Sequence, residues 1–378
     1  MEAVDLTHVP VVDNHCHGVT TDQTFGDVEA WRRASTESTD PGMPREHVAT
    51  TAFYRRLIRA LSHFLGCEPT EDAVFAARTA RDGRELTAEL LRAANIDTLL
   101  LDTGFPPPEE VFSVPEFGEL GGCRAEPMLR LEVLMEGLLA GHDTLADTEQ
   151  ALAAALNDVR AGGHVALKSI VAYRTGLDIR EWPREEAEAS FREHRRSALK
   201  GSTRLVHKPL LDTLLHVAFA QAARQEVPVQ FHVGYGDADT DLLLGNPLLL
   251  RAVLEAPEYR PMPVVLLHEC YPYTRQGGYL AAVYENVYLD LSYGIPLLGY
   301  CEISRLHPPG SRRRFELQAH IQLGRYRRAE AALDECHGRR LIGEALGGLV
   351  AQGESDLDEV EAVGESLLRG NVTRLYGL

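Results

Sequence analysis

The feature that most constrains the fold is a repeated alternation of short apolar runs with longer helical segments. Helical periodicity separates most of these runs, which indicates parallel βαβ units and an α/β protein. Seven units in a row favour a (β/α)8 TIM barrel over an open sheet. The length of 378 residues fits one barrel with insertions, so we expect a single domain over residues 1–378. The expected strands are 11–17, 98–104, 125–131, 164–171, 227–233, 263–268 and 287–291.

Residues 20–92 interrupt the alternation with several helical segments between the first two strands. The stretch 48–65 is amphipathic, with apolar residues at helical spacing. A single crossover needs much less helix than this. We therefore interpret 20–92 as a helical insertion over the mouth of the barrel.

The composition limits the classes of molecule that we expect the protein to bind. The net charge of −18 argues against binding to nucleic acid or to an anionic membrane, and no apolar stretch is long enough to span a bilayer. The N-terminus has no signal-peptide pattern, and the six cysteines form no Cys-x-x-Cys pair, which favours a cytoplasmic protein. We expect a small-molecule substrate, and the possibility of a homo-oligomer stays open.

A His-x-His-Gly sequence ends the first strand. Side chains alternate between the two faces of a strand, so His15 and His17 point the same way and Cys16 points the other. Two imidazoles on one face can share a divalent cation. The alternative is a pair of histidines in a turn, and this segment alone does not decide between them.

Three further strands end in a residue that can take part in chemistry. Lys168 lies late in the fourth strand, His232 ends the fifth and His268 ends the sixth. Each alone could be a buried, hydrogen-bonded side chain. A barrel brings the carboxyl ends of its strands to one cavity, so the four histidines together predict a metal site.

At these residues the chain resembles the amidohydrolase superfamily, and within it the amidohydrolase-2 group related to the N-terminal domain of FluG-type and nodulin-type glutamine synthetase fusions. The resemblance spans nearly the whole chain and implies a distorted (β/α)8 barrel with one or two divalent metal ions, Zn²⁺ or Mn²⁺. The matching segments are 13–18, 167–177, 228–237, 266–275 and 370–376.

The resemblance also implies roles for these residues. His15, His17 and His232 match metal ligands, and His268 matches a histidine that binds a second metal or holds the water. Lys168 lies where some members carry a carboxylated lysine that bridges two metals. It could instead pair with the carboxylate of a substrate.

The chemistry implied is hydrolysis of a C–N bond by a metal-activated water, in a small, carboxylate-bearing substrate. Arg174 and Arg275 could bind an anionic group, or form surface salt bridges. One alternative is a non-oxidative decarboxylase of the same superfamily. Another is a catalytically impaired metal-binding protein.

That last alternative arises because the aspartate expected at the end of strand eight is not recognisable. Arginine and histidine rise sharply over 303–337, and residues 322–326 read one base later can spell Ser-Ser-Asp-Gly. We therefore hypothesise a compensated frameshift there. The alternative is a divergent loop in which Asp290 or Asp334 substitutes. In both cases we expect no convincing eighth strand, helix over 315–336, and weak or absent activity.

Overall fold

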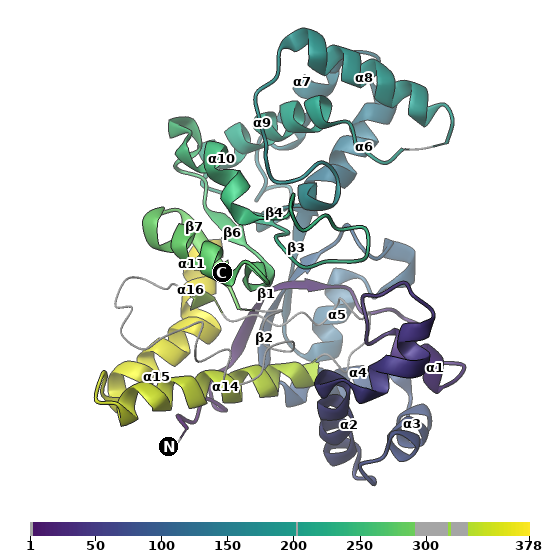
Figure 1. Ribbon diagram of the computed structural model, residues 1–378, viewed down its shortest axis with the longest axis vertical. Coiled ribbons are helices and arrows are strands. Elements are labelled where there is room, and N and C mark those ends of the chain that lie inside the picture. Colours follow the sequence, from purple (N-terminus) through teal and green to yellow (C-terminus); the bar gives the residue numbers. More distant parts are fainter. Residues whose placement is uncertain (1–2, 202, 292–316, 319–331) are drawn as a thin grey trace.

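One curled, parallel sheet forms the centre of the protein (Figure 1). A computed structural model describes residues 3–201, 203–291, 317–318 and 332–378. The strands follow one another in the order of the sequence, and the seven predicted strands are confirmed to within two residues at each end. They are β1 (Val11–His17), β2 (Ile96–Asp102), β3 (Arg124–Arg130), β4 (Ala166–Ser169), β5 (Val229–Phe231), β6 (Val264–Leu266), β7 (Val287–Asp290) and β8 (Leu317–Gln318).

Helices connect the strands and cover the outside of the sheet (Figure 1). The α-helices are α1 (Val28–Arg33), α2 (Ala52–Leu65), α3 (Glu71–Thr79), α4 (Gly83–Ala93), α5 (Val114–Gly121), α6 (Leu131–Gly141), α7 (Leu145–Ala155), α8 (Arg184–Ala198), α9 (Lys208–Gln225), α10 (Arg251–Glu255), α11 (Thr274–Val283), α14 (Ala332–Ala351), α15 (Leu357–Glu365) and α16 (Asn371–Tyr376). The shorter turns used below are η7 (His268–Cys270) and η9 (Ser366–Gly370). No helix in the described part of the chain is long and apolar enough to cross a membrane.

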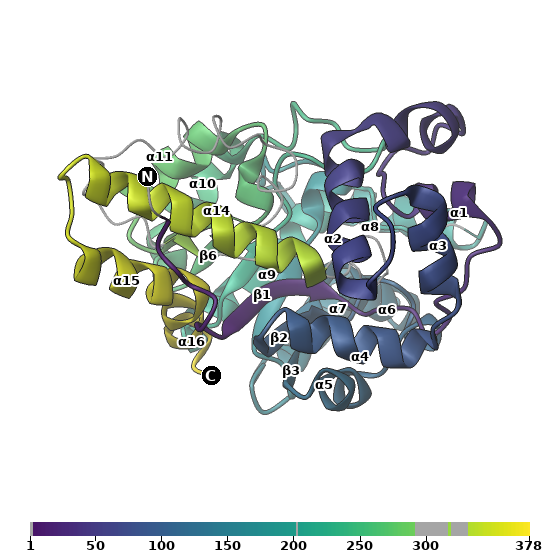
Figure 2. The same ribbon diagram turned by 90° about the horizontal axis from the view of Figure 1, so that it is seen from below.

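Helices α1–α4 lie between β1 and β2, where the insertion was expected. Local sequence fixes the ends of α2: the Thr51 hydroxyl accepts a hydrogen bond from the Tyr54 amide, and Gly66 ends the helix at φ 69°. Glycine adopts this left-handed conformation without steric cost. Helices α1, α2 and α3 share an apolar cluster that includes Trp31 and Leu61, whereas α4 packs its Leu90 into a second cluster with β1 and β2. Figure 2 shows α14 running toward α2, which it contacts.

The sheet differs from the prediction where the chain should close into a barrel. Leu317 and Gln318 pair with Leu289 and Asp290 of β7, so a strand of two residues is present where no convincing eighth strand was expected. Within the described residues, no pairing joins β8 to β1. A closed barrel is therefore not seen in that part of the chain. The prediction of helix over 315–336 is wrong at the two strand residues and correct from residue 332, where α14 begins.

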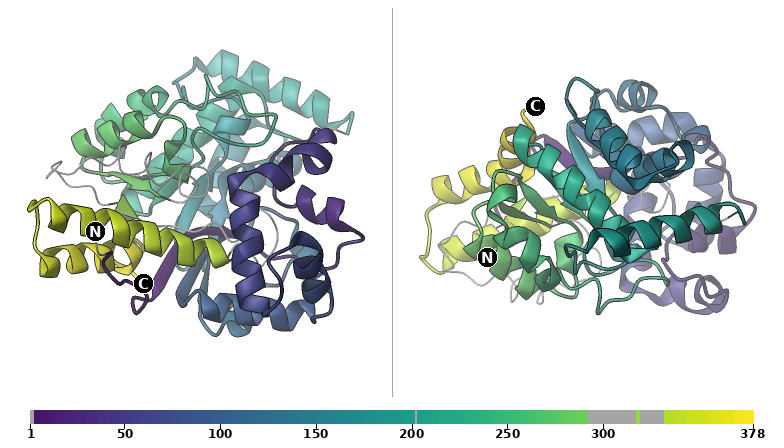
Figure 3. Two further views of the ribbon diagram at one scale, coloured as in Figure 1. Left: turned by 60° about the horizontal axis from the view of Figure 1, so that its bottom comes forward. Right: turned by 90° about the horizontal axis from the view of Figure 1, so that it is seen from above.

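The C-terminal segments lie at this seam between β1 and β8. Both η9 and α16 contact β1 and β8. Figure 3 shows the yellow C-terminal helices beside the purple first strand in both views. Tyr376 of α16 is fully buried among apolar side chains of the strands, including Val12 and Leu100. Residues 303–316 and 319–331, and with them the frameshift hypothesis, lie outside the described residues.

Candidate metal centre and substrate pocket

The strand ends meet at a cavity of about 660 Å³. Six of the seven residues singled out from the sequence line it: His15, His17, Lys168, Arg174, His232 and His268. Arg275 does not. It is exposed on the first turn of α11, and the structure gives it no place in this pocket.

His15 and His17 lie on one face of β1, as the alternation of strand side chains predicts. Both are buried, and their ring centroids are 5.1 Å apart. Cys16 points the other way, into a separate apolar cluster. The His17 Nδ1 atom lies 3.0 Å from the Phe105 carbonyl oxygen, which can only accept, so Nδ1 donates and Nε2 carries the lone pair.

His232 and His268 complete the group. The two rings share a hydrogen bond of 2.9 Å between His268 Nε2 and His232 Nδ1, and the His15 and His268 centroids are 5.9 Å apart. Residues 268–270 all have positive φ, from 52° to 65°. This backbone conformation costs free energy in residues other than glycine. Strain of this kind often accompanies functional sites, and here it occurs where His268 enters the cavity.

Asp290 stabilises this turn. Its Oδ1 accepts a hydrogen bond of 2.8 Å from the Glu269 amide, and the side chain is fully buried at the end of β7. It is not among the residues that line the cavity. Asp102 does not line the cavity either, and Asp290 is close enough to Lys168 to influence its pKa, so Asp290 as a substitute for the missing aspartate stays a prediction. Nothing is described of the Asp334 side chain.

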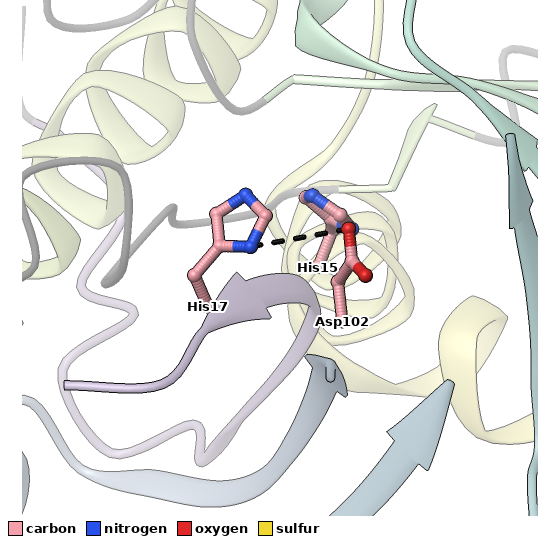
Figure 4. Close-up of side chains that lie close together, drawn as sticks. All are labelled: His15, His17 and Asp102. Atoms are coloured by element: carbon pink, nitrogen blue, oxygen red, sulfur yellow. Dashed lines mark ion pairs between the residues drawn. The ribbon is translucent and has the colours of Figure 1, made fainter. Parts of the chain in front are cut away.

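The sequence did not single out Asp102, which ends β2 beside the histidines (Figure 4). One ligand atom each from His15, His17 and Asp102 lies within 4.8 Å of the others, and His17 Nδ1 is 3.9 Å from Asp102 Oδ2. The signal was available, because Asp102 ends an apolar strand as His232 and His268 do.

Asp102 also forms a buried ion pair. Arg130 donates to both carboxylate oxygens, with Nε 3.1 Å from Oδ1 and 3.2 Å from Oδ2. Burial acts to raise the pKa of Asp102, but Arg130 and His17 outweigh it and the pKa is lowered. Asp102 is therefore an anion that can neutralise a cation at this site.

The nitrogen donors fit a divalent metal ion. Burial, with Lys168 and His17 nearby, lowers the pKa of His15 well below its usual value, so the ring is neutral. Neutral imidazole is the form that binds metals. The buried His15 Nε2 has no hydrogen-bond partner among the described residues, as expected of an atom that coordinates an ion.

Lys168 extends from β4 into the same cavity and is fully buried. Burial lowers the pKa of its amine to about 7, against the opposing influence of Asp102. Much of the lysine is thus uncharged near neutral pH. An uncharged amine is a nucleophile, which the ammonium form is not.

We call the four histidines, Lys168 and the Arg130–Asp102 pair the floor of the cavity, and its outer charged residues the rim. The rim consists of Arg33, Glu37, Arg174, Arg204, Asp237 and Asp239. Its charges are largely paired: Arg174 lies 3.3 Å from Glu136, and Arg204 lies 3.0 Å from Asp239. The helical insertion contributes Arg33 and Glu37, so it helps to form the pocket.

Comparisons with known proteins give matches that cover nearly the whole chain. A protein from Lactobacillus casei, provisionally assigned as a metal-dependent hydrolase, has 31% sequence identity and a TM-score of 0.82, covering 100% of this chain and 98% of its own. A uronate isomerase from Thermotoga maritima has a TM-score of 0.66 at 14% identity, covering 98% of this chain and 95% of its own, which shows the fold alone.

Protein fluG of Emericella nidulans is 39% identical over 142 residues, which cover 35% of this chain and only 16% of fluG. No protein-family profile matches the chain. The fold and the floor of the cavity together define a metal-dependent enzyme. The chain belongs to the amidohydrolase superfamily, as the match to the Lactobacillus casei protein over the whole chain and the partial match to fluG show.

Proposed function

We propose that this enzyme hydrolyses a C–N bond in a small, carboxylate-bearing substrate. The observation that carries the proposal is the contrast between the cavity and the rest of the chain. Four arginines, the partly protonated Lys168 and three acidic side chains line the cavity, in a chain of net charge −18. Such a cavity favours an anionic ligand. The cavity volume is within the usual range for small-molecule sites.

His15, His17 and His232 would hold the metal, with Zn²⁺ as the first candidate and Mn²⁺ as the second, in a site for one or two ions. A metal held by these residues would lower the pKa of a water molecule and polarise the carbonyl group of the substrate. The negative charge of Asp102 stabilises a cation beside these histidines. We assign His268 to orienting the water, because its ring is held by His232 at the floor.

Arg174 is the proposed partner of the substrate carboxylate, since it reaches the cavity from the rim. Lys168 is the proposed carboxylated lysine. Its lowered pKa supports this role over that of a permanent cation, because only the uncharged amine takes up CO2.

The described residues do not include the strand-eight aspartate that would act as the base and pass the proton of the water to the leaving group. We propose that the superfamily's strand-eight aspartate is lost to the frameshift across 303–337, and that the corrected chain closes the distorted (β/α)8 barrel and regains activity. If instead the corrected, metal-loaded chain turned over nothing, a metal-binding protein without catalysis would be the better assignment.

Metal analysis of the purified protein tests the centre. We expect bound metal in the wild type and a loss of most of it in His15→Ala and in His232→Ala. His63→Ala, which removes an exposed histidine on α2, is the matched control and should retain metal. Unchanged metal content in both site variants would remove the central claim.

A panel of N-acyl and other amide carboxylates then tests the reaction. The hydrolase proposal predicts release of an amine or ammonia. Release of CO2 without either would favour the decarboxylase instead.

We propose a small-molecule substrate, and a cytoplasmic location on the basis of the scattered cysteines.

A further inference from the structure

Gln230 lies beneath the proposed metal centre and contacts one of its ligands. It is in the middle of β5, two residues before His232, and is fully buried. Its side-chain amide makes contacts in two directions. Oε1 lies 2.8 Å from His15 Nδ1, while Nε2 lies 2.7 Å from the Asn14 carbonyl oxygen and 2.8 Å from the Tyr376 hydroxyl.

These contacts determine which way the amide faces. A backbone carbonyl can only accept a hydrogen bond, so the NH2 group of Gln230 must be the one that faces Asn14. The Asn14 side-chain oxygen, 3.3 Å from the same nitrogen, agrees with this orientation. The carbonyl oxygen of the amide then faces His15.

The orientation in turn determines the state of His15. The Gln230 oxygen accepts but cannot donate, so His15 Nδ1 must carry the hydrogen in the contact between them. The lone pair of the neutral ring is then on Nε2, the buried atom without a hydrogen-bond partner among the described residues. A ligand histidine is commonly oriented by a hydrogen bond of this kind to its second nitrogen.

We infer that Gln230 is a positioning residue that holds His15 with its hydrogen on Nδ1 and its lone pair on Nε2, aimed at the cavity, and that Tyr376 holds Gln230. The inference rests on the proposed metal centre. It assigns a function to the C-terminal helix α16, which is far in the sequence from the residues that line the cavity. The Tyr376 ring is buried in the interior of the sheet, and Arg160 anchors its backbone through a hydrogen bond of 2.7 Å to the carbonyl oxygen.

The experiment compares Gln230→Leu, Tyr376→Phe and Tyr259→Phe. Tyr259→Phe is the matched control. The Tyr259 hydroxyl is 2.8 Å from Nδ1 of His216 on α9, and His216 is not among the residues lining the cavity. The first readout is Zn²⁺ affinity by competition with a chromophoric chelator. The second is the tautomer of His15 in metal-free protein, from ¹⁵N NMR of histidine-labelled chain assigned with His15→Gln.

We expect Gln230→Leu to bind Zn²⁺ ten- to a hundredfold more weakly, the range typical of groups that orient a ligand. Its His15 should show a mixture of tautomers. Tyr376→Phe should weaken binding by less, since Gln230 retains Asn14, and Tyr259→Phe should match the wild type. If Gln230→Leu fails to fold, Gln230→Glu tests the same contact, because it retains an acceptor toward His15, and it should preserve Nδ1 protonation.

Two results would overturn the inference. One is Zn²⁺ affinity in Gln230→Leu within twofold of the wild type, and the other is a wild-type His15 protonated on Nε2. Failure of the proposed function looks different. If the wild type bound no metal, the proposed metal centre would be rejected. The positioning role would still stand if His15 carried its hydrogen on Nδ1 in the wild type but not in Gln230→Leu.

Discussion

The floor and the rim of the cavity differ in how their charges are stabilised. On the floor, His15, Lys168 and Asp102 are almost completely removed from water. Their protonation is therefore set by burial and by each other. On the rim, Arg204 and Asp239 are about half exposed, and water and salt screen their attraction.

The difference indicates which part of the pocket performs chemistry and which selects the ligand. The neutral imidazole of His15 and the partly neutral amine of Lys168 are reactive groups, and burial away from water keeps them in these states. Exposed ion pairs cost little free energy to break, so the charged residues of the rim can exchange their partners for charged groups of a substrate. Mutations on the floor should therefore change stability and metal binding, while those on the rim should change ligand affinity.

The largest effect is expected for the buried ion pair. Arg130→Met leaves the Asp102 carboxylate buried without its main cation, which should lower the free energy of unfolding by about 3–5 kcal/mol. Urea unfolding of metal-free protein measures this. Arg124→Met, at the other end of β3, removes an exposed ion pair with Glu126 and should cost less than about 1 kcal/mol.

The double variant Arg130→Met/Asp102→Asn sharpens the test. It removes both charges, so much of the lost stability should return. If the double variant were as unstable as Arg130→Met alone, packing of the arginine rather than the buried charge would explain the loss.

A smaller effect is expected from Lys168, and it depends on pH. The folded-state pKa of about 7 lies below the usual lysine value near 10.4. Between these values the unfolded chain binds one more proton than the folded chain, so the folded state gains stability as pH rises. We expect this gain to be roughly 1 kcal/mol per pH unit from pH 7 to 9, in metal-free, CO2-free buffer.

Lys168→Met should lose that slope and be more stable than the wild type at pH 7. Lys200→Met, which removes an exposed lysine, should retain the slope. Equal slopes in wild type and Lys168→Met would mean that the folded protein does not depress the pKa of this amine.

The sequence predicted most of the floor because one rule covers it. Residues at the ends of parallel strands converge, and His15, Lys168 and His232 each end an apolar run. Asp102 obeys the same rule but was missed, because only histidines and a lysine were singled out at the strand ends. Gln230 could not have been found this way, since it lies inside a strand and its contacts come from β1 and α16.

The rim and the seam between β8 and β1 were harder to predict. Apart from Arg33 at the end of α1, the charged residues of the rim come from loops, whose paths follow no periodicity. Arg174 and Arg275 were therefore indistinguishable in the sequence. At the seam, the two-residue strand β8 was missed because no apolar run marks it. The nucleotide sequence decides the frameshift hypothesis: without an alternative frame that spells Ser-Ser-Asp-Gly, flanked by compensating insertions or deletions, it fails.

Arg174 and Arg275 give the smallest and most selective test of the comparison. Arg174 reaches the cavity and pairs with Glu136, whereas Arg275 is exposed elsewhere. With a substrate from the amide panel, Arg174→Met should raise KM about tenfold or more, as expected for the loss of one charge-assisted hydrogen bond to a carboxylate. Its free energy of unfolding should fall by less than that of Arg130→Met, because Glu136 retains a hydrogen bond from the Leu205 amide after the ion pair is lost. Arg275→Met should leave both quantities unchanged, and a rise in KM with this variant instead would place the ligand's carboxylate outside the cavity.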